Sequence, residues 1–168
     1  MLLKKMDRAW LRYIIFIIIS IFYSQSVYAA CGGLGCSCSV ATTAVSFGNY
    51  NPISATATTA NGKVAVTCSA LVIFTASYVI SMAKGNSATY TPRFMNLAGI
   101  HLNYNLYTTA GFASIWGDGT GGTVTVNDSY TAIGLSETRN YTPFGRIPAL
   151  QTIGAGTYTD TVLVTVTY

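Results

Sequence analysis

The sequence predicts an all-β protein, an incomplete immunoglobulin-like sandwich that lacks its last strand. Short alternating runs separated by Gly, Pro, Asn and Asp recur after residue 29, and no segment there has sustained helical periodicity. About seven short strands at this spacing are typical of a two-sheet sandwich. Residues 158–168 form a strongly patterned strand, and no partner strand is encoded after it. The sheet is therefore expected to be unfinished.

The first 29 residues are expected to be a signal peptide, with cleavage after Ala29. A basic start at residues 4–12 precedes an apolar run at residues 13–23, and Val27-Tyr28-Ala29 fits the small-residue cleavage pattern. The run is about half the ~20 residues that a membrane span needs, so no span is expected in the mature chain. An uncleaved N-terminal anchor is the alternative.

Residues 30–168 suit one domain with its own core. They carry little charge: five basic and four acidic residues, so the composition gives no reason to expect nucleic-acid binding. The composition, rich in Thr, Val, Ala, Gly and Tyr, favours strands and turns. The candidate strands in chain order are residues 39–47, 63–69, 74–82, 100–107, 123–126, 141–147 and 157–168. Turns are expected between them at 48–52, 61–62, 84–87 and 117–122.

The last strand has one apolar face, formed by Val162, Val164, Val166 and Tyr168, and threonines on the other face with Leu163 as the exception. Burial of each apolar side chain is worth about 1.5–3 kcal/mol, so an uncovered face would be costly. Edge strands are usually blunted by charge, proline or a bulge, and this strand has none of these. Tyr158 lies where a tyrosine corner would precede the sixth strand of a seven-stranded sandwich. An ordinary edge strand is the alternative.

Export places the four cysteines in an oxidising compartment, where disulfides are the default. Four cysteines allow three pairings, and Cys36 and Cys38 are too close to bridge each other comfortably. We favour Cys38–Cys68, with Cys31–Cys36 as a small ring, although the pairing of the latter two stays open. The cysteines lack a nearby His or carboxylate and a Cys-x-x-Cys pair, so neither a metal site nor a cofactor is expected.

Several motifs, in order, resemble the spore coat protein U domain family. They are Cys38-Ser39-Val40, the segments 45–52, 62–68, 102–107 and 141–148, Trp116-Gly117-Asp118-Gly119, and 156–162. The likeness covers residues 30–168 and rests on the shared order and spacing of the motifs. The family includes a myxobacterial spore-coat protein and subunits of archaic, Csu-type chaperone–usher pili.

The resemblance implies an exported structural subunit of a bacterial surface pilus or of a spore or cell coat, with a role in adhesion and biofilms. Its partners would be a periplasmic chaperone, an outer-membrane usher and neighbouring pilus subunits. One of them would donate a strand to the open edge. By this likeness Cys38 and Cys68 form the family disulfide, and Val162, Val164, Val166 and Tyr168 line the acceptor groove. Residues 30–37 contain three glycines and one leucine, which makes a poor donor strand.

The residues give little support to catalysis. His101 is the only histidine and is expected to face solvent or a polar rim. Asp118 in a glycine-rich stretch is expected to stabilise a turn, and Asp128 and Glu137 are expected on a loop. The main rival to a structural subunit is a self-sufficient secreted binding module that uses an exposed aromatic surface, with carbohydrate as the candidate ligand. Its candidate residues are Tyr90, Tyr107, Trp116, Tyr130 and Tyr141.

Overall fold

The computed structural model describes residues 30–168, and the expected signal peptide lies outside them. The described residues form eleven strands and no helix, so they contain no helix that could cross a membrane. The strands are β1 (Ala30–Gly32), β2 (Ser37–Thr43), β3 (Thr58–Asn61), β4 (Lys63–Ser69), β5 (Phe74–Met82), β6 (Arg93–Leu97), β7 (Ile100–Tyr107), β8 (Val126–Ala132), β9 (Ser136–Tyr141), β10 (Phe144–Ile147) and β11 (Val164–Thr167). The all-β prediction is confirmed.

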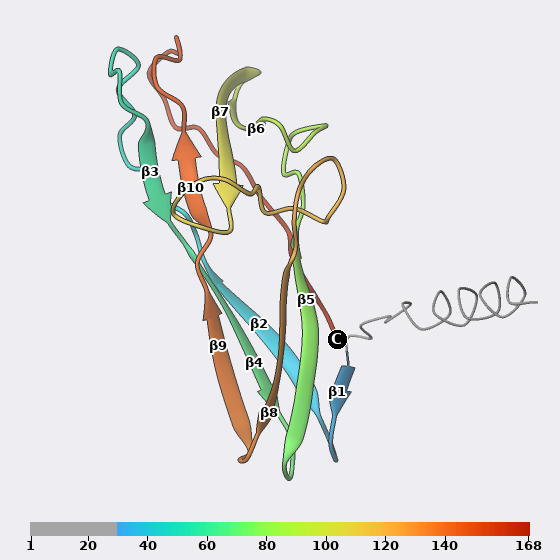
Figure 1. Ribbon diagram of the computed structural model, residues 1–168. Coiled ribbons are helices and arrows are strands. Elements are labelled where there is room, and N and C mark those ends of the chain that lie inside the picture. Colours follow the sequence, from blue (N-terminus) through green and yellow to red (C-terminus); the bar gives the residue numbers. More distant parts are fainter. Residues whose placement is uncertain (1–29) are drawn as a thin grey trace, which may run out of the picture.

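The strands form two packed layers (Figure 1). In one layer, β5 pairs with β8 along one edge and with both β11 and β1 along the other. The other layer contains the sheet β2-β4-β9 and, beyond it, the sheet β3-β10-β7-β6. Because β3 leads into β4 and β9 leads into β10, these two sheets run into one another along the length of the molecule (Figure 1).

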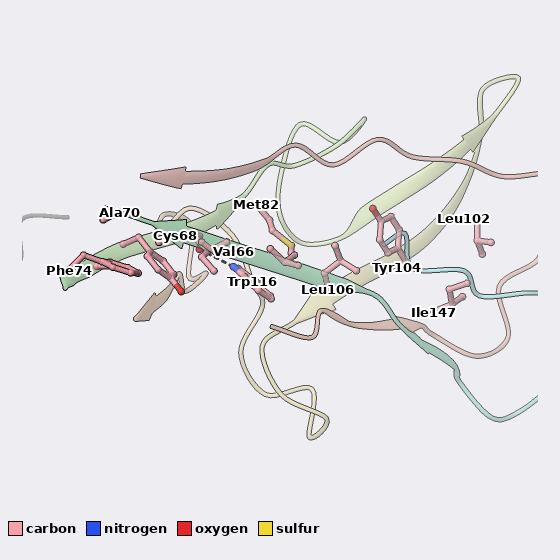
Figure 2. Close-up of a cluster of buried hydrophobic side chains, with 14 residues drawn as sticks. Val66, Cys68, Ala70, Phe74, Met82, Leu102, Tyr104, Leu106, Trp116 and Ile147 are labelled. Atoms are coloured by element: carbon pink, nitrogen blue, oxygen red, sulfur yellow. Dashed lines mark hydrogen bonds between the residues drawn. The ribbon is translucent and has the colours of Figure 1, made fainter. Parts of the chain in front are cut away.

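The hydrophobic core lies between β4 and β5, because each strand alternates buried and less buried residues. Val64, Val66 and Cys68 of β4 face the apolar side chains of β5, from Phe74 to Met82. Leu102, Tyr104 and Leu106 of β7 extend this core toward the far end of the molecule (Figure 2). Trp116 closes it from a loop and donates its indole N–H to the carbonyl oxygen of Ile80 over 3.0 Å.

A buried arginine holds the junction of β6 with the end of β5. Arg93 is fully buried and donates to the carbonyl oxygens of Ala83 and Trp116 and to Asn105 Oδ1. Its guanidinium also lies 5.0 Å from the centre of the Tyr90 ring. Burial lowers the pKa of Arg93, and the convergent carbonyl oxygens offset that cost. Asn105 is buried as the partner of Arg93.

Some predicted strands have the observed bounds and others do not. Residues 63–69, 74–82 and 100–107 match β4, β5 and β7. The predicted strand at 123–126 is wrong because this segment mainly forms the approach to β8, and residues 141–147 are divided between β9 and β10 at Pro143. Asp128 and Glu137 lie on β8 and β9 and not on a loop.

Candidate functional site: an open groove between two strand edges

One wall of the candidate site is β11, which pairs with β5 from Val164↔Met82 to Thr167↔Val79. Among residues 30–168, no segment pairs with its other edge, because β11 ends the strand order of its sheet. Val162, Val164 and Val166 pack against the core but stay only partly buried, while Leu163 and the threonines between them are exposed. The apolar face of this strand is therefore incompletely covered by the described chain.

The opposite wall is β2 and the segment that follows it. β2 pairs with β4 along one edge, and within the part of the chain that the structure describes its other edge is also free. Val40 of β2 is 43% exposed. The two free edges belong to different sheets and border the same side of the sandwich (Figure 1).

Two hollows of about 480 and 700 Å³ lie between these walls. The smaller is lined by Thr42 and Thr43 on one side and by Val162 and Val164 on the other. The larger continues it between residues 44–50 and 153–158. The two hollows share Ala44, Val45, Phe47, Met95 and Tyr158 in their lining, so they form one continuous groove. Its floor is largely apolar, with Leu106 under the first hollow and Leu102 under the second.

Asp160 holds the segment that leads into β11, the first wall of the groove. Its carboxylate accepts hydrogen bonds from the hydroxyl of Tyr104 and from the backbone N–H groups of Asn86 and Thr161, each at 2.7 Å. Burial raises the pKa of Tyr104, and the bond to Asp160 raises it further, so the phenol stays protonated. Tyr158 donates its hydroxyl to the carbonyl oxygen of Gly154 over 3.1 Å, the geometry of a tyrosine corner.

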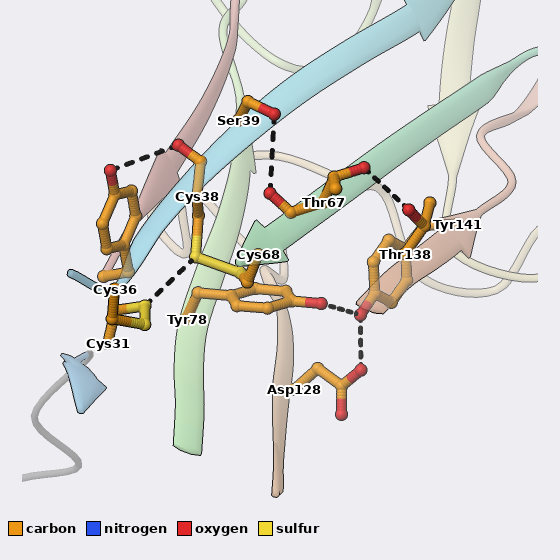
Figure 3. Close-up of a disulfide and its surroundings, with 11 residues drawn as sticks. Cys31, Cys36, Cys38, Ser39, Thr67, Cys68, Tyr78, Asp128, Thr138 and Tyr141 are labelled. Atoms are coloured by element: carbon orange, nitrogen blue, oxygen red, sulfur yellow. Dashed lines mark hydrogen bonds between the residues drawn. A yellow bond between two sulfur atoms is a disulfide. The ribbon is translucent and has the colours of Figure 1, made fainter. Parts of the chain in front are cut away.

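Beyond the hollows, one hydrogen bond joins the two walls beside a pair of disulfides. The hydroxyl of Tyr168 donates to the carbonyl oxygen of Cys38 in β2 over 3.2 Å. Disulfides join Cys38 to Cys68 and Cys31 to Cys36 (Figure 3). The Cys31 and Cys38 sulfur atoms are 3.8 Å apart, so the two disulfides lie side by side. The walls are thus tied together at this end, which we call the closed end, and neither hollow extends to it.

Of the predicted strand at 157–168, only Val164–Thr167 is regular, as β11. Val164 and Val166 lie on it, Val162 lies before it and Tyr168 after it. Val162 and Val164 line the smaller hollow, whereas Val166 and Tyr168 line neither hollow. Sequence reasoning did not find the opposite wall, Val45 and Phe47, or the floor residues Met95 and Tyr104. Val45 and Phe47 alternate with Ser46 in period two, and this pattern is the signal that could have identified them. No local sequence pattern could have identified Asp160, because its role depends on hydrogen bonds from residues far away in the sequence, such as Tyr104 and Asn86.

An apolar surface covers the end of the molecule where three loops meet, and we call it the apolar end. It consists of Leu34, Leu71, Val72, Ile73, Ile133 and Leu135, all exposed. The loops are joined by backbone hydrogen bonds from Ala70 N–H to Leu135 O and from Leu71 N–H to Leu34 O, 3.1 and 3.0 Å long. The sequence has no charged residue at positions 32–36, 69–75 or 132–136. Exposed apolar patches of this kind mark interaction sites.

The other candidate residues have structural roles. His101 is exposed and stacks on Phe94 with ring centroids 3.7 Å apart. The Asp118 carboxylate accepts from the N–H and hydroxyl of Thr120, which stabilises the turn and lowers the pKa of Asp118. Trp116 and Tyr90 are buried, so they cannot contribute to an exposed aromatic surface. Among residues 30–168, no cluster of three His, Cys, Asp or Glu side chains could hold a metal ion.

The comparisons with known proteins agree with this architecture. Residues 30–165 match the family model of the Spore Coat Protein U domain. A solved complex of a chaperone and a tip adhesion subunit, CsuC–CsuE from the archaic chaperone–usher Csu pili of Acinetobacter baumannii, resembles the chain with a TM-score of 0.52 and 22% sequence identity. The match covers 79% of this chain and 40% of that chain, so this chain spans less than half of the matched one. That likeness establishes a shared fold.

No curated protein matches the sequence. The family model, however, spans nearly all of the described residues and agrees with the ordered motifs of the sequence. The chain therefore belongs to the Spore Coat Protein U domain family.

Proposed function

We propose that this protein is an exported, non-enzymatic subunit of a bacterial surface pilus or coat, completed by a strand that another protein donates. One observation carries the proposal: among residues 30–168, two free strand edges border one apolar groove. A strand added there would pair its backbone with the free edge of β11 and place alternate side chains over Val162, Val164 and Val166. This donated strand would become the next strand of the sheet, beside β11.

The burial of apolar side chains favours the addition of such a strand. Three partly buried valines and the apolar floor would lose their remaining contact with water, and each fully buried apolar side chain contributes about 1.5–3 kcal/mol. Because these side chains are already partly buried, each gains only part of this value, but the sum is still a sizeable fraction of the roughly 5–15 kcal/mol that separates the folded and unfolded states of a domain. An unfilled subunit would therefore be marginally stable and would depend on a partner during export.

The proposal assigns three kinds of partner. A periplasmic chaperone would fill the groove first, an outer-membrane usher would receive the complex, and a neighbouring subunit would then supply the permanent strand. The protein would pass through the periplasm and end at the cell surface. Support comes from the family and from the fold shared with a chain of the solved chaperone–tip adhesion complex.

The apolar end supports a role in adhesion to hydrophobic surfaces, which would also serve biofilm formation. Its six side chains are held on loops joined by backbone hydrogen bonds, so little conformational entropy is lost when they contact a surface. The absence of charge in these loops removes the cost of desolvating an ion. The groove and the apolar end are separate features, so assembly and adhesion can occur together.

The rival function is a self-sufficient binding module, and one experiment separates the two. Tyr168 lies at the closed end of the groove, so a short linker after it can return a designed donor of alternating Thr and Val, about eight residues long, along β11. We call this fusion the filled chain. The proposal predicts poor periplasmic yield for the unfused chain and a soluble monomer with a sharp unfolding transition for the filled chain.

The matched control carries the same linker and donor with aspartate in place of each valine, and it is expected to behave as the unfused chain. If the unfused chain folds alone with a sharp transition and the donor adds no stability, the groove needs no partner and the binding module is favoured. Binding of a carbohydrate array by the unfused chain would then identify its ligand class.

A further inference from the structure

The segment at residues 30–36 begins with β1, which pairs with the part of the β5 edge that β11 leaves free. β11 and β1 both run antiparallel to β5 along the same edge, with Thr167 opposite Val79 and Ala30 opposite Ser77. In this register only Tyr78 lies between the two partners. β1 therefore continues the line of β11, and the C-terminal end of the chain lies beside the start of β1 (Figure 1).

Covalent and hydrogen bonds hold this segment in place. The Cys31–Cys36 disulfide closes a small ring, and the N–H of Cys36 donates to the carbonyl oxygen of Gly33 over 3.3 Å. The N–H of Leu71 donates to the carbonyl oxygen of Leu34 over 3.0 Å, which ties the ring to the loop ahead of β5. Figure 3 shows the ring beside the Cys38–Cys68 disulfide.

The glycines of this segment are explained by close packing on β5. A Cβ atom on Gly32 would lie 2.9 Å from Thr75 Oγ1, and one on Gly33 would lie 2.9 Å from the Cβ of Phe74. Gly33 also has a φ of 145°, which L residues rarely adopt. Side chains at these positions would push the segment off the sheet. The same absence of side chains deprives the segment of the alternating apolar residues that a donor strand needs.

We infer that residues 30–36 complete this protein's own sheet and do not act as a donor strand for another subunit. The inference rests on the proposed function and deepens it: the subunit's groove is filled by a neighbour, while its own first strand stays at the closed end of that groove. Residues 30–36 of such a subunit are therefore not available to complete a neighbouring sandwich.

Amide hydrogen exchange followed by mass spectrometry tests the inference directly. In the filled chain, the peptide that covers residues 30–36 is expected to exchange far more slowly than an unstructured peptide of the same sequence. The Gly33→Ala substitution is expected to raise its exchange rate at least about tenfold, because the added methyl group meets Phe74 and β1 opens locally. Gly111→Ala is the matched control, since a Cβ atom there has no neighbour within 4 Å.

The oligomeric state completes the test, because donation would join copies into multimers that resist SDS without heating. Absence of multimers in the unfused chain, with a protected first strand, supports the inference. Multimers that vanish in the filled chain, or free exchange of residues 30–36, would overturn it and leave the groove proposal intact. A filled chain that is no more stable than the unfused chain would overturn both the groove proposal and this inference, because the groove would then not accept a donor strand.

Discussion

The hydroxyl of Tyr104 donates a hydrogen bond to Asp160 Oδ2 over 2.7 Å, and this bond joins the floor of the groove to its wall. Asp160 lies just before β11 and also accepts the backbone N–H groups of Asn86 and Thr161. Three donors from separate parts of the chain thus converge on one carboxylate. The start of the acceptor edge is positioned by this carboxylate, although the residue belongs to no strand.

Replacement of Asp160 by alanine is therefore expected to destabilise the filled chain by about 2–3 kcal/mol, because hydrogen bonds to a charged group are lost and the Tyr104 hydroxyl loses its partner. Urea denaturation followed by the fluorescence of Trp116 measures the loss. Asp118→Ala is the control, since that exposed carboxylate supports only its own turn, and a loss below about 1 kcal/mol is expected there. Equal losses would contradict the role of Asp160.

The sequence predicted those strands whose burial alternates strongly. Residues 63–69 and 74–82 bury every second side chain, so the period-two pattern identifies both bounds. Five strands, β1, β3, β6, β8 and β9, were wholly or largely missed. For β9 and β6 the physical reason is clear. β9 contains Glu137 and Arg139 and has no buried residue, and β6 begins with Arg93, which reads as a surface residue until its carbonyl partners are known.

The candidate site also has one part that the sequence could predict and another that it could not. The face formed by Val162, Val164 and Val166 could be predicted, because it depends on a local alternation. The other wall and the floor depend on contacts between segments far apart in the chain, such as Val45 with Tyr158 around one hollow. No local pattern contains that information. The role of β1 was missed as well, because three glycines suggest a flexible lead and not a strand.

Arg93→Met is expected to cost about 3–5 kcal/mol, because it leaves the carbonyl oxygens of Ala83 and Trp116 buried without donors. Arg93→Lys is expected to recover only part of this loss, since one ammonium group cannot reach acceptors on both sides of the site. Arg139→Lys is the control: its exposed pair with Glu137 is worth less than about 1 kcal/mol. Denaturation midpoints of the filled chain report all three, and similar midpoints would contradict the prediction.

Stability is expected to fall steeply at alkaline pH. Burial raises the pKa of Tyr78 from 10.0 to about 12 and also raises the pKa values of Tyr104 and Tyr141. The folded protein keeps these phenol protons, whereas the unfolded chain releases them above about pH 10, so the unfolded state then binds fewer protons. The stabilisation is complete below that pH and is lost progressively as the pH rises toward the folded-state values.

Each such phenol is expected to contribute a slope of about 1.4 kcal/mol per pH unit in this window. Chemical denaturation across the alkaline range measures the slope, and tyrosinate absorbance reports ionisation. Tyr78→Phe is expected to reduce the slope, because it removes one buried phenol proton. A wild-type protein whose stability is flat across the window would contradict the burial of these groups.

Adhesion is expected to depend on the apolar end. Ile133 is 92% exposed, so Ile133→Asp should leave the fold intact and place a charge where a hydrophobic surface makes contact. Loss of one apolar contact of about 1.5–3 kcal/mol corresponds to at least about a tenfold loss of affinity. Binding of the filled chain to polystyrene beads measures the effect. Leu150→Asp is the control, because Leu150 is also exposed but follows β10, outside the apolar end, and its φ of 58° suits aspartate. Equal retention of the two variants would show that the apolar end does not make the contact.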